Sequence, residues 1–497
     1  MDEEKNEESQ ENPLVKVRYD KLKQLQEMGI DPYPNRYEVK DKIRAVIEKH
    51  SALQPEEKTE DFVKIAGRMM ARREMGKASF GNVKDFTGSL QFYIREDDVG
   101  KDAYNLFKIL DIGDIIGLEG FVFKTKKGEL SVHVQKIELL SKSLYPLPEK
   151  WHGLKDDEAR YRQRYVDMIM NDEVKHTFLM RTRIVNEIRS FLVGKGFVEV
   201  ETPILQPIYG GAAAKPFTTV HNELKMKMFL RISNELYLKR LIVGGFEKVF
   251  EFSRDFRNEG IDARHNPEFT VMETMCAYAD YNDSMKLTEE LLSHVAKHLL
   301  GKTEVDYQEQ LINLHPPFQR ITMLEAVKKY TDVDFSTIKT VDEARDAANE
   351  LGVRVEGDTV GKILSEVYEE LVEPHIVQPT FVMDYPIEVS PLAKRKKNAA
   401  DYTERFELII GGREYANVYS ELNEPIVLRK NWEEQRRLME KGDQEAQPMD
   451  EDFIRALEVG MPPTSGIGIG IDRFVMLLTN SASIRDVIMF PTLKKKE

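Results

Sequence analysis

Residues 249–275 read VFEFSRDFRNEGIDARHNPEFTVMETM, and this stretch decides the fold of the C-terminal part of the chain. Apolar residues alternate on both sides of a polar segment, 258–267, which predicts two antiparallel strands joined by a loop. A guanidinium offers paired planar donors to a phosphate, and an aromatic face can stack on a purine. The hairpin is therefore a candidate nucleotide site, although an ordinary ion-paired hairpin explains the pattern equally well. Its candidate residues are Arg257, Glu259, Arg264, His265 and Phe269.

A glycine-rich strand near the C-terminus is a second candidate, PPTSGIGIGIDRFVMLLTN at 462–480. In residues 466–471 the isoleucines share one face of a strand, and the glycines leave the other face bare. Such a face lets a ligand approach the backbone. Asp472 then begins an apolar helix, so Arg473 lies in the first turn, where the helix dipole also favours an anion. The alternative is a glycine-rich packing strand.

A third stretch, RFELIIGGREYANVYSEL at 405–422, reads as a hairpin with a two-residue glycine turn. That turn pairs Glu407 with Ala416 and makes Glu414 its diagonal neighbour, about 7–8 Å away. Two carboxylates at that separation can share hard cations such as Mg²⁺. Exposed acids on a surface hairpin are the alternative.

The remaining polar residues of this hairpin have the other parity along the strand: Asn417, Tyr419 and Glu421. A regular ladder would place them on the opposite face from the two acids. If all five line one site, a β-bulge near 415–417 is required.

The N-terminal part contains short strands between residues 62 and 145, separated by turn glycines. About five strands and a helix near 102–110 are typical of a small Greek-key barrel of the OB kind. Such barrels bind single-stranded nucleic acid by stacking bases on aromatic side chains. Phe80 and Phe92 are candidates for stacking, and a place in the barrel core is the alternative for each.

Composition limits the class of protein. The chain has 497 residues and a net charge of −14, but residues 62–145 hold fourteen bases and eleven acids. This local excess suits nucleic acid and a solvated surface alike. The acidic start, MDEEKNEESQE, is unlike a signal peptide, no apolar run is long enough for a membrane span, and there is one cysteine. These features predict a cytoplasmic protein without disulfides or a membrane partner.

The expected fold class is α+β with four segments. Residues 1–60 form an acidic leader and N-terminal helices near 15–28 and 39–50. Residues 61–145 form the OB-fold barrel, and 146–175 form a linker with a charged helix near 156–170. Residues 176–497 form a domain built on an antiparallel sheet flanked by helices, including helical stretches at 282–300 and 340–373.

Together these stretches resemble the class II aminoacyl-tRNA synthetases, and most closely the bacterial lysine enzymes, over essentially the whole chain. FRNE through RHNPEF, residues 256–269, is similar to motif 2 of that class, and GIGIGIDR at 466–473 is similar to motif 3. GFVEVETP at 196–203 resembles motif 1, whose proline lies at the dimer interface. Further similar stretches are GRMMARREMGKASF, GGAAAKPF, ELYLKRLIVGGFEKVFE and AYADY.

The resemblance implies ATP-dependent activation of L-lysine to lysyl-adenylate, followed by transfer to the terminal ribose of tRNA(Lys). Arg257 would hold the α-phosphate, and Arg473 would be the second catalytic arginine. The other ATP-binding residues would be Glu259 and Phe269 at adenine, and Arg264 and His265 at the outer phosphates. Glu407 and Glu414 would hold Mg²⁺, up to three ions per subunit. The enzyme would be a homodimer formed through motif 1.

The resemblance also implies a lysine site. Glu421 would pair with the ε-ammonium of lysine, because a buried cation needs a partner. Gly211 and Glu235 would seat the α-amino end. The other lysine contacts would be Glu273, Asn417, Tyr419 and Gly468.

One position departs from the family. Met275 stands where the family commonly has a tyrosine whose hydroxyl helps to hold the ε-ammonium. A thioether is a weak acceptor, so we expect weaker lysine binding or tolerance of an altered lysine.

In the barrel, Phe80 and Gln91 match family residues that stack on and hydrogen-bond to the central anticodon base, with Glu129 as a third contact. The basic residues of the 15–28 helix would add contacts to the tRNA backbone: Lys16, Arg18, Lys21 and Lys23. An inactive tRNA-binding paralogue and a ligase that modifies a protein are the competing readings. The intact arginines and acids oppose the first, and the intact barrel opposes the second.

Overall fold

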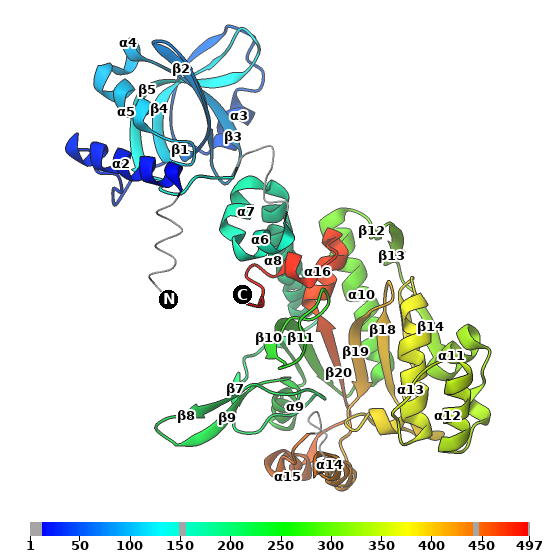
Figure 1. The fold of residues 1–497 in the computed structure, drawn as a ribbon. Helices are drawn as coiled ribbons and strands as arrows, with labels where there is room; N and C mark the ends of the chain where they lie inside the picture. The colour runs from blue at the N-terminus through cyan, green and yellow to red at the C-terminus, as the bar shows by residue number, and fades with distance from the viewer. Residues whose placement is uncertain (1–11, 149–155, 441–446, 496–497) are drawn as a thin grey trace. The chain divides into compact units, whose positions relative to one another are not determined.

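A computed structural model describes residues 12–148, 156–440 and 447–495 (Figure 1). The chain divides into two compact units, Met1–Leu154 and Lys155–Glu497. Each unit has a hydrophobic core of its own.

The first unit is built around a closed barrel with the strand order β1-β2-β3-β5-β4. Its strands are β1 (Lys58–Met75), β2 (Ala78–Lys84), β3 (Ser89–Arg95), β4 (Ile115–Lys124) and β5 (Leu130–Ser141). Buried and less buried residues alternate along β2 and β3, as a barrel with an apolar interior requires. Phe92 is fully buried in this core, so of its two candidate roles the place in the barrel core is confirmed and stacking on a base is excluded.

The described part of the first unit also contains four helices: α2 (Pro13–Glu27), α3 (Ile43–Lys49), α4 (Glu96–Val99) and α5 (Lys101–Ile109). Helix α2 begins at a side-chain cap from Asn12. Arg18 on α2 is buried and donates to the backbone carbonyls of Ile112 and Ser143, and Lys21 pairs with Asp111 at 2.5 Å. These two cations hold α2 against the barrel, so their contacts are structural. Lys16 and Lys23, the other two basic residues of the prediction, are exposed.

The second unit contains an eight-stranded sheet. The strands, in sheet order, are β14 (Gln319–Thr322), β15 (Thr380–Met383), β18 (Arg405–Ile409), β19 (Glu414–Ser420), β20 (Thr464–Gly470), β11 (Glu268–Ala277), β10 (Lys248–Phe256) and β6 (Val198–Glu199). The six inner strands pair antiparallel, and only the two edge pairs are parallel. Smaller sheets join β7 (Leu205–Gln206), β9 (Met226–Leu230) and β8 (Thr218–His221); β12 (Glu304–Tyr307) and β13 (Gln310–Asn313); and β16 (Arg395–Lys396) and β17 (Ala399–Thr403).

Helices α8 (Asp172–Gly194), α10 (Tyr281–Leu300) and α16 (Ile471–Thr479) share a core with the large sheet (Figure 1). A second cluster is formed with α9 (Glu235–Val243), α14 (Pro425–Glu440) and α15 (Glu451–Gly460). The other helices are α6 (Asp157–Arg162), α7 (Arg164–Met170), α11 (Met323–Thr331), α12 (Val341–Glu350), α13 (Val360–Leu371) and α17 (Ile484–Val487), with short 3-10 turns at Phe335–Thr337, Glu373–His375 and Ile387–Val389.

Two predicted helical stretches are divided in the structure. Residues 340–373 form α12 and α13, because Gly352, at a φ of +79°, follows the end of α12 and Thr359 caps the start of α13. Residues 156–170 form α6 and α7, which meet at Gln163. Across the residues that the structure describes, no helix has both the length and the apolar character to cross a membrane.

Candidate active site

Strands β10 and β11 form the predicted hairpin, and their register places its loop at 257–267. Asp262 accepts the backbone N–H groups of Arg264 and His265 at 2.6 and 2.7 Å, so the loop is held from within. Burial opposes ionisation here, but the hydrogen bonds from His265 and these amides lower the pKa of Asp262 to about 2. At the base of the loop the Arg257 guanidinium lies 5.1 Å from the centre of the Phe269 ring. The hairpin therefore presents cations beside an aromatic face.

Strand β20 lies between β11 and β19, with its glycines toward a cavity. Gly468 pairs with Glu273 on β11 and with Asn417 on β19. Ile467 and Ile469 point into the core, 2% and 0% exposed, as the alternation predicted. A Cβ at Gly468 would meet no atom closer than 3.7 Å, so the bare face opens onto space.

Arg473 lies in the first turn of α16, as predicted. Its Nη1 donates to the backbone carbonyl of Glu414 at 2.6 Å and lies 3.2 Å from that residue's carboxylate. The Arg473 side chain is 29% exposed and lines the cavity, so it can meet an anion there.

The β18–β19 hairpin differs from the predicted register. Glu407 pairs with Asn417, not with Ala416, because the ladder shifts by one residue between Ala416 and Glu414. Tyr415 is the extra residue. The bulge expected near 415–417 is therefore confirmed, and it brings both acids to the same cavity as Asn417.

The acids of this hairpin are crowded. Arg405 holds Glu407 at 2.5 Å, yet burial and then the neighbouring Glu414 raise the pKa of Glu407 to about 7. The pKa of Glu373 also rises to about 7, through burial and then repulsion from Glu407 and Glu414. Carboxyl groups with such mutual repulsion favour a bound cation.

A second acidic group lies where α9 meets the end of β19. Nζ of Lys239 lies 2.5 Å from Glu235 and 2.5 Å from Glu421, and it is 1% exposed. The Tyr419 hydroxyl donates to the other oxygen of Glu235, also at 2.5 Å. Burial would lower the pKa of Lys239, but the two carboxylates raise it instead. The ammonium group of Lys239 thus forms ion pairs with two buried carboxylates.

Glu421 keeps one oxygen facing the bare strand. Among the described residues its Oε1 has no hydrogen-bond partner. A Cβ on Gly466 would come within 2.3 Å of this oxygen and within 2.9 Å of the Met275 sulfur, which marks how closely they pack. Burial raises the pKa of Glu421 to about 8; Lys239 opposes the shift and Glu235 adds to it.

Two further acids lie beside this group. Glu273 accepts the Ser233 hydroxyl at 3.2 Å, and burial, then Asp255 and Glu235, raise its pKa well above the usual value. The pKa of Asp255 rises to about 6 because burial outweighs the attraction of Arg231. This end of the cavity is therefore rich in carboxyl groups that an added cation would help to ionise.

These elements enclose one cavity of about 440 Å³, large enough for a nucleotide-sized ligand. The structure brings to its wall all the ATP, metal and lysine residues expected from the sequence: Gly211, Glu235, Arg257, Glu259, Arg264, His265, Phe269, Glu273, Glu407, Glu414, Asn417, Tyr419, Glu421, Gly468 and Arg473. Arg257, Arg264 and His265 come from the β10–β11 loop, Phe269 comes from β11 and Arg473 from α16. The second acidic group comes from α9, β11 and the residue that follows β19.

Sequence reasoning missed Lys239, Arg405 and Gln447. Gln447 accepts the backbone N–H of Gly211 at 3.2 Å from far along the chain. Arg405 donates to Asn417 as well as holding Glu407. For Lys239 the sequence offered one signal: it lies inside the apolar stretch ELYLKRLIV. A lysine that is buried with such a stretch needs an acidic partner nearby.

On the barrel, β2 and β3 place Phe80 opposite Tyr93, with ring centres 4.9 Å apart. Gln91 lies on the same face and donates to the Ser131 hydroxyl at 2.8 Å. Both Phe80 and Gln91 are partly exposed, whereas Glu129 is exposed in the turn before β5. The face thus combines aromatic rings with an amide.

Comparisons with known proteins agree with this geometry. The family of tRNA synthetases class II (D, K and N) matches residues 156–494, and the OB-fold nucleic acid binding domain matches residues 63–140. The chain is 56% identical over 487 residues to a lysine–tRNA ligase of Carboxydothermus hydrogenoformans, covering 98% of this chain and 99% of that protein. It is similarly 56% identical to one of Moorella thermoacetica (98% and 99% covered) and 53% identical to one of Syntrophomonas wolfei (97% and 97%).

Proposed function

This chain belongs to the class II lysine–tRNA ligases, and from that premise we propose that it activates L-lysine with ATP and transfers the lysyl group to the 3′ end of tRNA(Lys). The first step releases pyrophosphate and the second releases AMP. One observation supports lysine above all: a single cavity has arginines on one wall and a buried group of carboxyls on another. An anionic amino acid would be repelled by those carboxyls, whereas an ammonium completes their charge balance.

The nucleotide would lie against the β10–β11 hairpin. Phe269 stacks on adenine, Glu259 accepts from its amino group, and Arg257 binds the α-phosphate. Arg473, Arg264 and His265 hold the outer phosphates. Adenylate formation needs no general base, because the lysine carboxylate attacks phosphorus directly. The arginines act by orienting the reactants and by stabilising the charge that develops in the displacement.

The paired acids of the β18–β19 hairpin suit Mg²⁺. Their donors are carboxylate oxygens, which Mg²⁺ prefers. Burial and then repulsion from Glu414 raise the pKa of Glu407, and a bound cation would offset both effects. Glu407 and Glu414 would hold the ion or ions, which would neutralise phosphate charge when bound. Arg405 fixes Glu407 in place at 2.5 Å.

The lysine would occupy the acidic end. Gly211 and Glu235 seat its α-amino end, and Oε1 of Glu421 receives the ε-ammonium. That oxygen is buried and lacks a hydrogen-bond partner among the described residues, so an ammonium there satisfies an otherwise costly acceptor. Further contacts come from Glu273, Asn417, Tyr419 and the bare backbone at Gly468.

Lys239 is a positioning residue in this scheme. It does not line the cavity, but it holds Glu235 and Glu421 from within the fold. One ammonium cannot balance two carboxylates, so the pair retains an unmet charge that the substrate supplies. The Tyr419 hydroxyl also donates a hydrogen bond to Glu235. The Met275 thioether has no proton to donate, so it cannot hold a carboxylate in this way.

The barrel would recognise the anticodon of tRNA(Lys). Phe80 stacks on the central base, Gln91 contacts its edge, and Glu129 adds a third contact. We assign the protein to the cytoplasm, where tRNA is charged for protein synthesis.

We also propose a homodimer formed through motif 1, residues 196–203. This segment includes β6, the edge strand of the large sheet. Apolar side chains in and after it are well exposed, namely Val198, Ile204, Leu205 and Ile208. Such a patch favours burial against a second copy.

Pyrophosphate exchange, measured with each of the twenty amino acids in turn, tests the first step. We expect exchange with lysine and at least a hundredfold less with the amino acids that have no side-chain cation, because their side chains leave Glu421 unpaired. Exchange with an uncharged or acidic amino acid at a comparable rate would contradict the proposal. Charging of total tRNA with radioactive lysine then tests the transfer step.

A further inference from the structure

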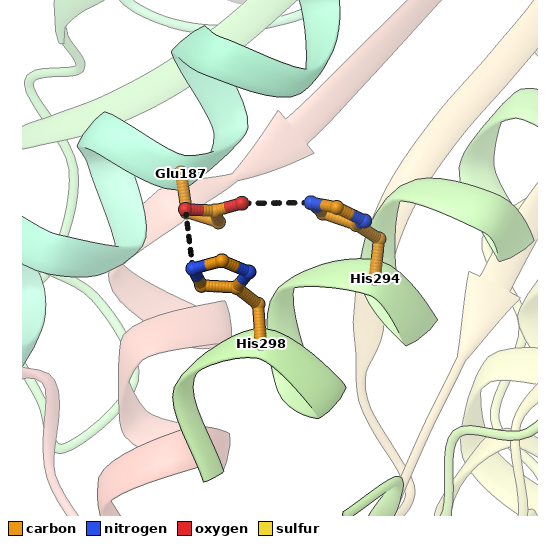
Figure 2. A group of neighbouring side chains, drawn as sticks. All are labelled: Glu187, His294 and His298. Carbon is orange, nitrogen blue, oxygen red and sulfur yellow. Dashed lines mark hydrogen bonds and ion pairs between the residues drawn. The ribbon is translucent and has the colours of Figure 1, made fainter. Parts of the chain in front are cut away.

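Away from the cavity, two histidines and a glutamate converge between α8 and α10. The sequence HVAKH at 294–298 places His294 and His298 one helical turn apart on one face of α10. Glu187 projects toward them from α8. Figure 2 shows the carboxylate facing a ring nitrogen of each histidine. The proposed lysine, ATP and tRNA contacts use none of the three.

The distances suit a shared ligand. His294 Nε2 lies 2.7 Å from one oxygen of Glu187, and His298 Nε2 lies 3.6 Å from the other. One ligand atom from each residue can be chosen so that all lie within 4.8 Å of one another. Tetrahedral ligands about 2.0–2.2 Å from zinc lie roughly 3.4 Å apart, so small side-chain rotations would close the set.

The two helices that carry these side chains, α8 and α10, are well packed. Both helices belong to the main hydrophobic core, and Glu187 lies between core residues Ile184 and Ile188 in the sequence of α8. The His294 ring packs 5.1 Å from Phe191 and 5.8 Å from the His298 ring. The ligand atoms are thus held on rigid elements, a feature of metal sites that keep their geometry.

From these contacts we propose that Glu187, His294 and His298 bind a divalent transition metal ion, with zinc as the preferred ion. Two imidazoles and one carboxylate are a set that zinc accepts, with a fourth position left for water. The imidazoles are 42% and 61% exposed, so that position is open to solvent. The ion would tie α8 to α10. The candidate site is empty.

Zinc titration of the full-length protein, monitored by calorimetry in the absence of ATP, tests this inference. We expect one site per chain in the wild type. His294→Ala and His298→Ala should each weaken zinc binding at least tenfold, and Glu187→Gln, which keeps the side-chain volume, should weaken it similarly. His176→Ala is the matched control, because His176 is an exposed histidine on α8 outside the cluster. It should bind zinc as the wild type does.

Two further measurements distinguish a specific metal site from weak, non-specific zinc binding at the surface. Co²⁺ bound at the site should give the intense visible absorption of a tetrahedral complex, and Glu187→Gln should abolish it. Zinc at a hundredfold excess over the wild-type Kd should lower the apparent unfolding constant about 100-fold in the wild type and in His176→Ala, and by about tenfold or less in the three cluster variants. Equal zinc affinity in the wild type and both histidine variants would overturn the inference. Unchanged lysine-dependent pyrophosphate exchange shows that each variant is folded.

Discussion

Nζ of Lys239 lies 2.5 Å from Glu421 and 2.5 Å from Glu235, and the lysine side chain is almost fully buried. An ammonium of the protein itself therefore lies outside the cavity, behind the carboxylates that would receive the substrate's ammonium. The pair of acids is half neutralised by the fold, and lysine would complete the balance. If this charge arrangement sets the affinity for lysine, changing Lys239 or the charge of Glu421 should change lysine binding.

Replacing Lys239 with methionine should weaken lysine binding by at least tenfold at neutral pH. Without the cation, burial and mutual repulsion raise the pKa of Glu421 beyond about 8, so more of it is protonated. Removing one partner of a buried charge pair typically costs about 2–5 kcal/mol. The check is KM for lysine in pyrophosphate exchange, with kcat recorded separately.

Lys239→Arg is the control, because it keeps the charge and should keep most of the affinity. The defect of Lys239→Met should shrink as pH rises toward 9, since Glu421 then ionises without help. A defect of equal size at every pH, in a variant that melts like the wild type, would point to a structural role only.

The wild type should also show pH-dependent lysine binding. The pKa of Glu421 is raised to about 8, so below this pH the carboxyl is increasingly protonated and cannot pair with the ammonium. KM for lysine should therefore fall up to about tenfold per pH unit as pH rises toward 8, and then level. Glu421→Gln should remove this slope and bind lysine poorly throughout. A flat wild-type profile between pH 6 and 8 would count against this role for Glu421.

Met275→Tyr should strengthen lysine binding several-fold. Met275 lines the cavity beside Glu421, where a hydroxyl could accept from the ammonium and a thioether cannot do so well. Met275→Leu is the matched control and should leave KM unchanged, because it supplies no new polar group. Equal lysine affinity in the wild type and Met275→Tyr would end the idea.

Gly468→Ala should weaken substrate binding without lowering the stability of the fold. The added Cβ would meet nothing closer than 3.7 Å, so the melting temperature should change little. The methyl group would nevertheless occupy the bare face between Glu273 and Asn417, and should raise KM for lysine or ATP at least tenfold. Unaltered kinetics would show that no substrate approaches this backbone.

Phe80→Ala should raise KM for tRNA by about 5- to 150-fold, because stacking on one base is worth roughly 1–3 kcal/mol. Pyrophosphate exchange, which needs no tRNA, should be unchanged. Phe86→Ala is the control: Phe86 is 69% exposed on the barrel and no anticodon contact is expected there. If both variants charge tRNA equally well, the proposed stacking face is wrong.

Much of the catalytic unit was predictable because its signals are local. The alternation of isoleucine and glycine in 466–471 fixes which face of β20 is bare, since side chains in a strand alternate strictly. The hairpin at 249–275 follows from two apolar strands around a polar loop. Residue type alone does not separate Phe92 from Phe80: Phe92 shares the buried face of β3 with Leu90 and Ile94, whereas Phe80 lies on the partly exposed face of β2.

The strands, the loop cations and the acids that line the cavity could be predicted from the amino-acid sequence, because hydrophobic period and residue type are local properties of the chain. Tertiary structure alone decided that Glu407 pairs with Asn417, because a single bulge at Tyr415 shifts the ladder. It also decided that Lys239 serves both Glu235 and Glu421. Such long-range pairing depends on how α9 packs against β19 and the residues that follow it. A buried charge needs an oppositely charged partner, and no local sequence pattern shows which residue that partner is.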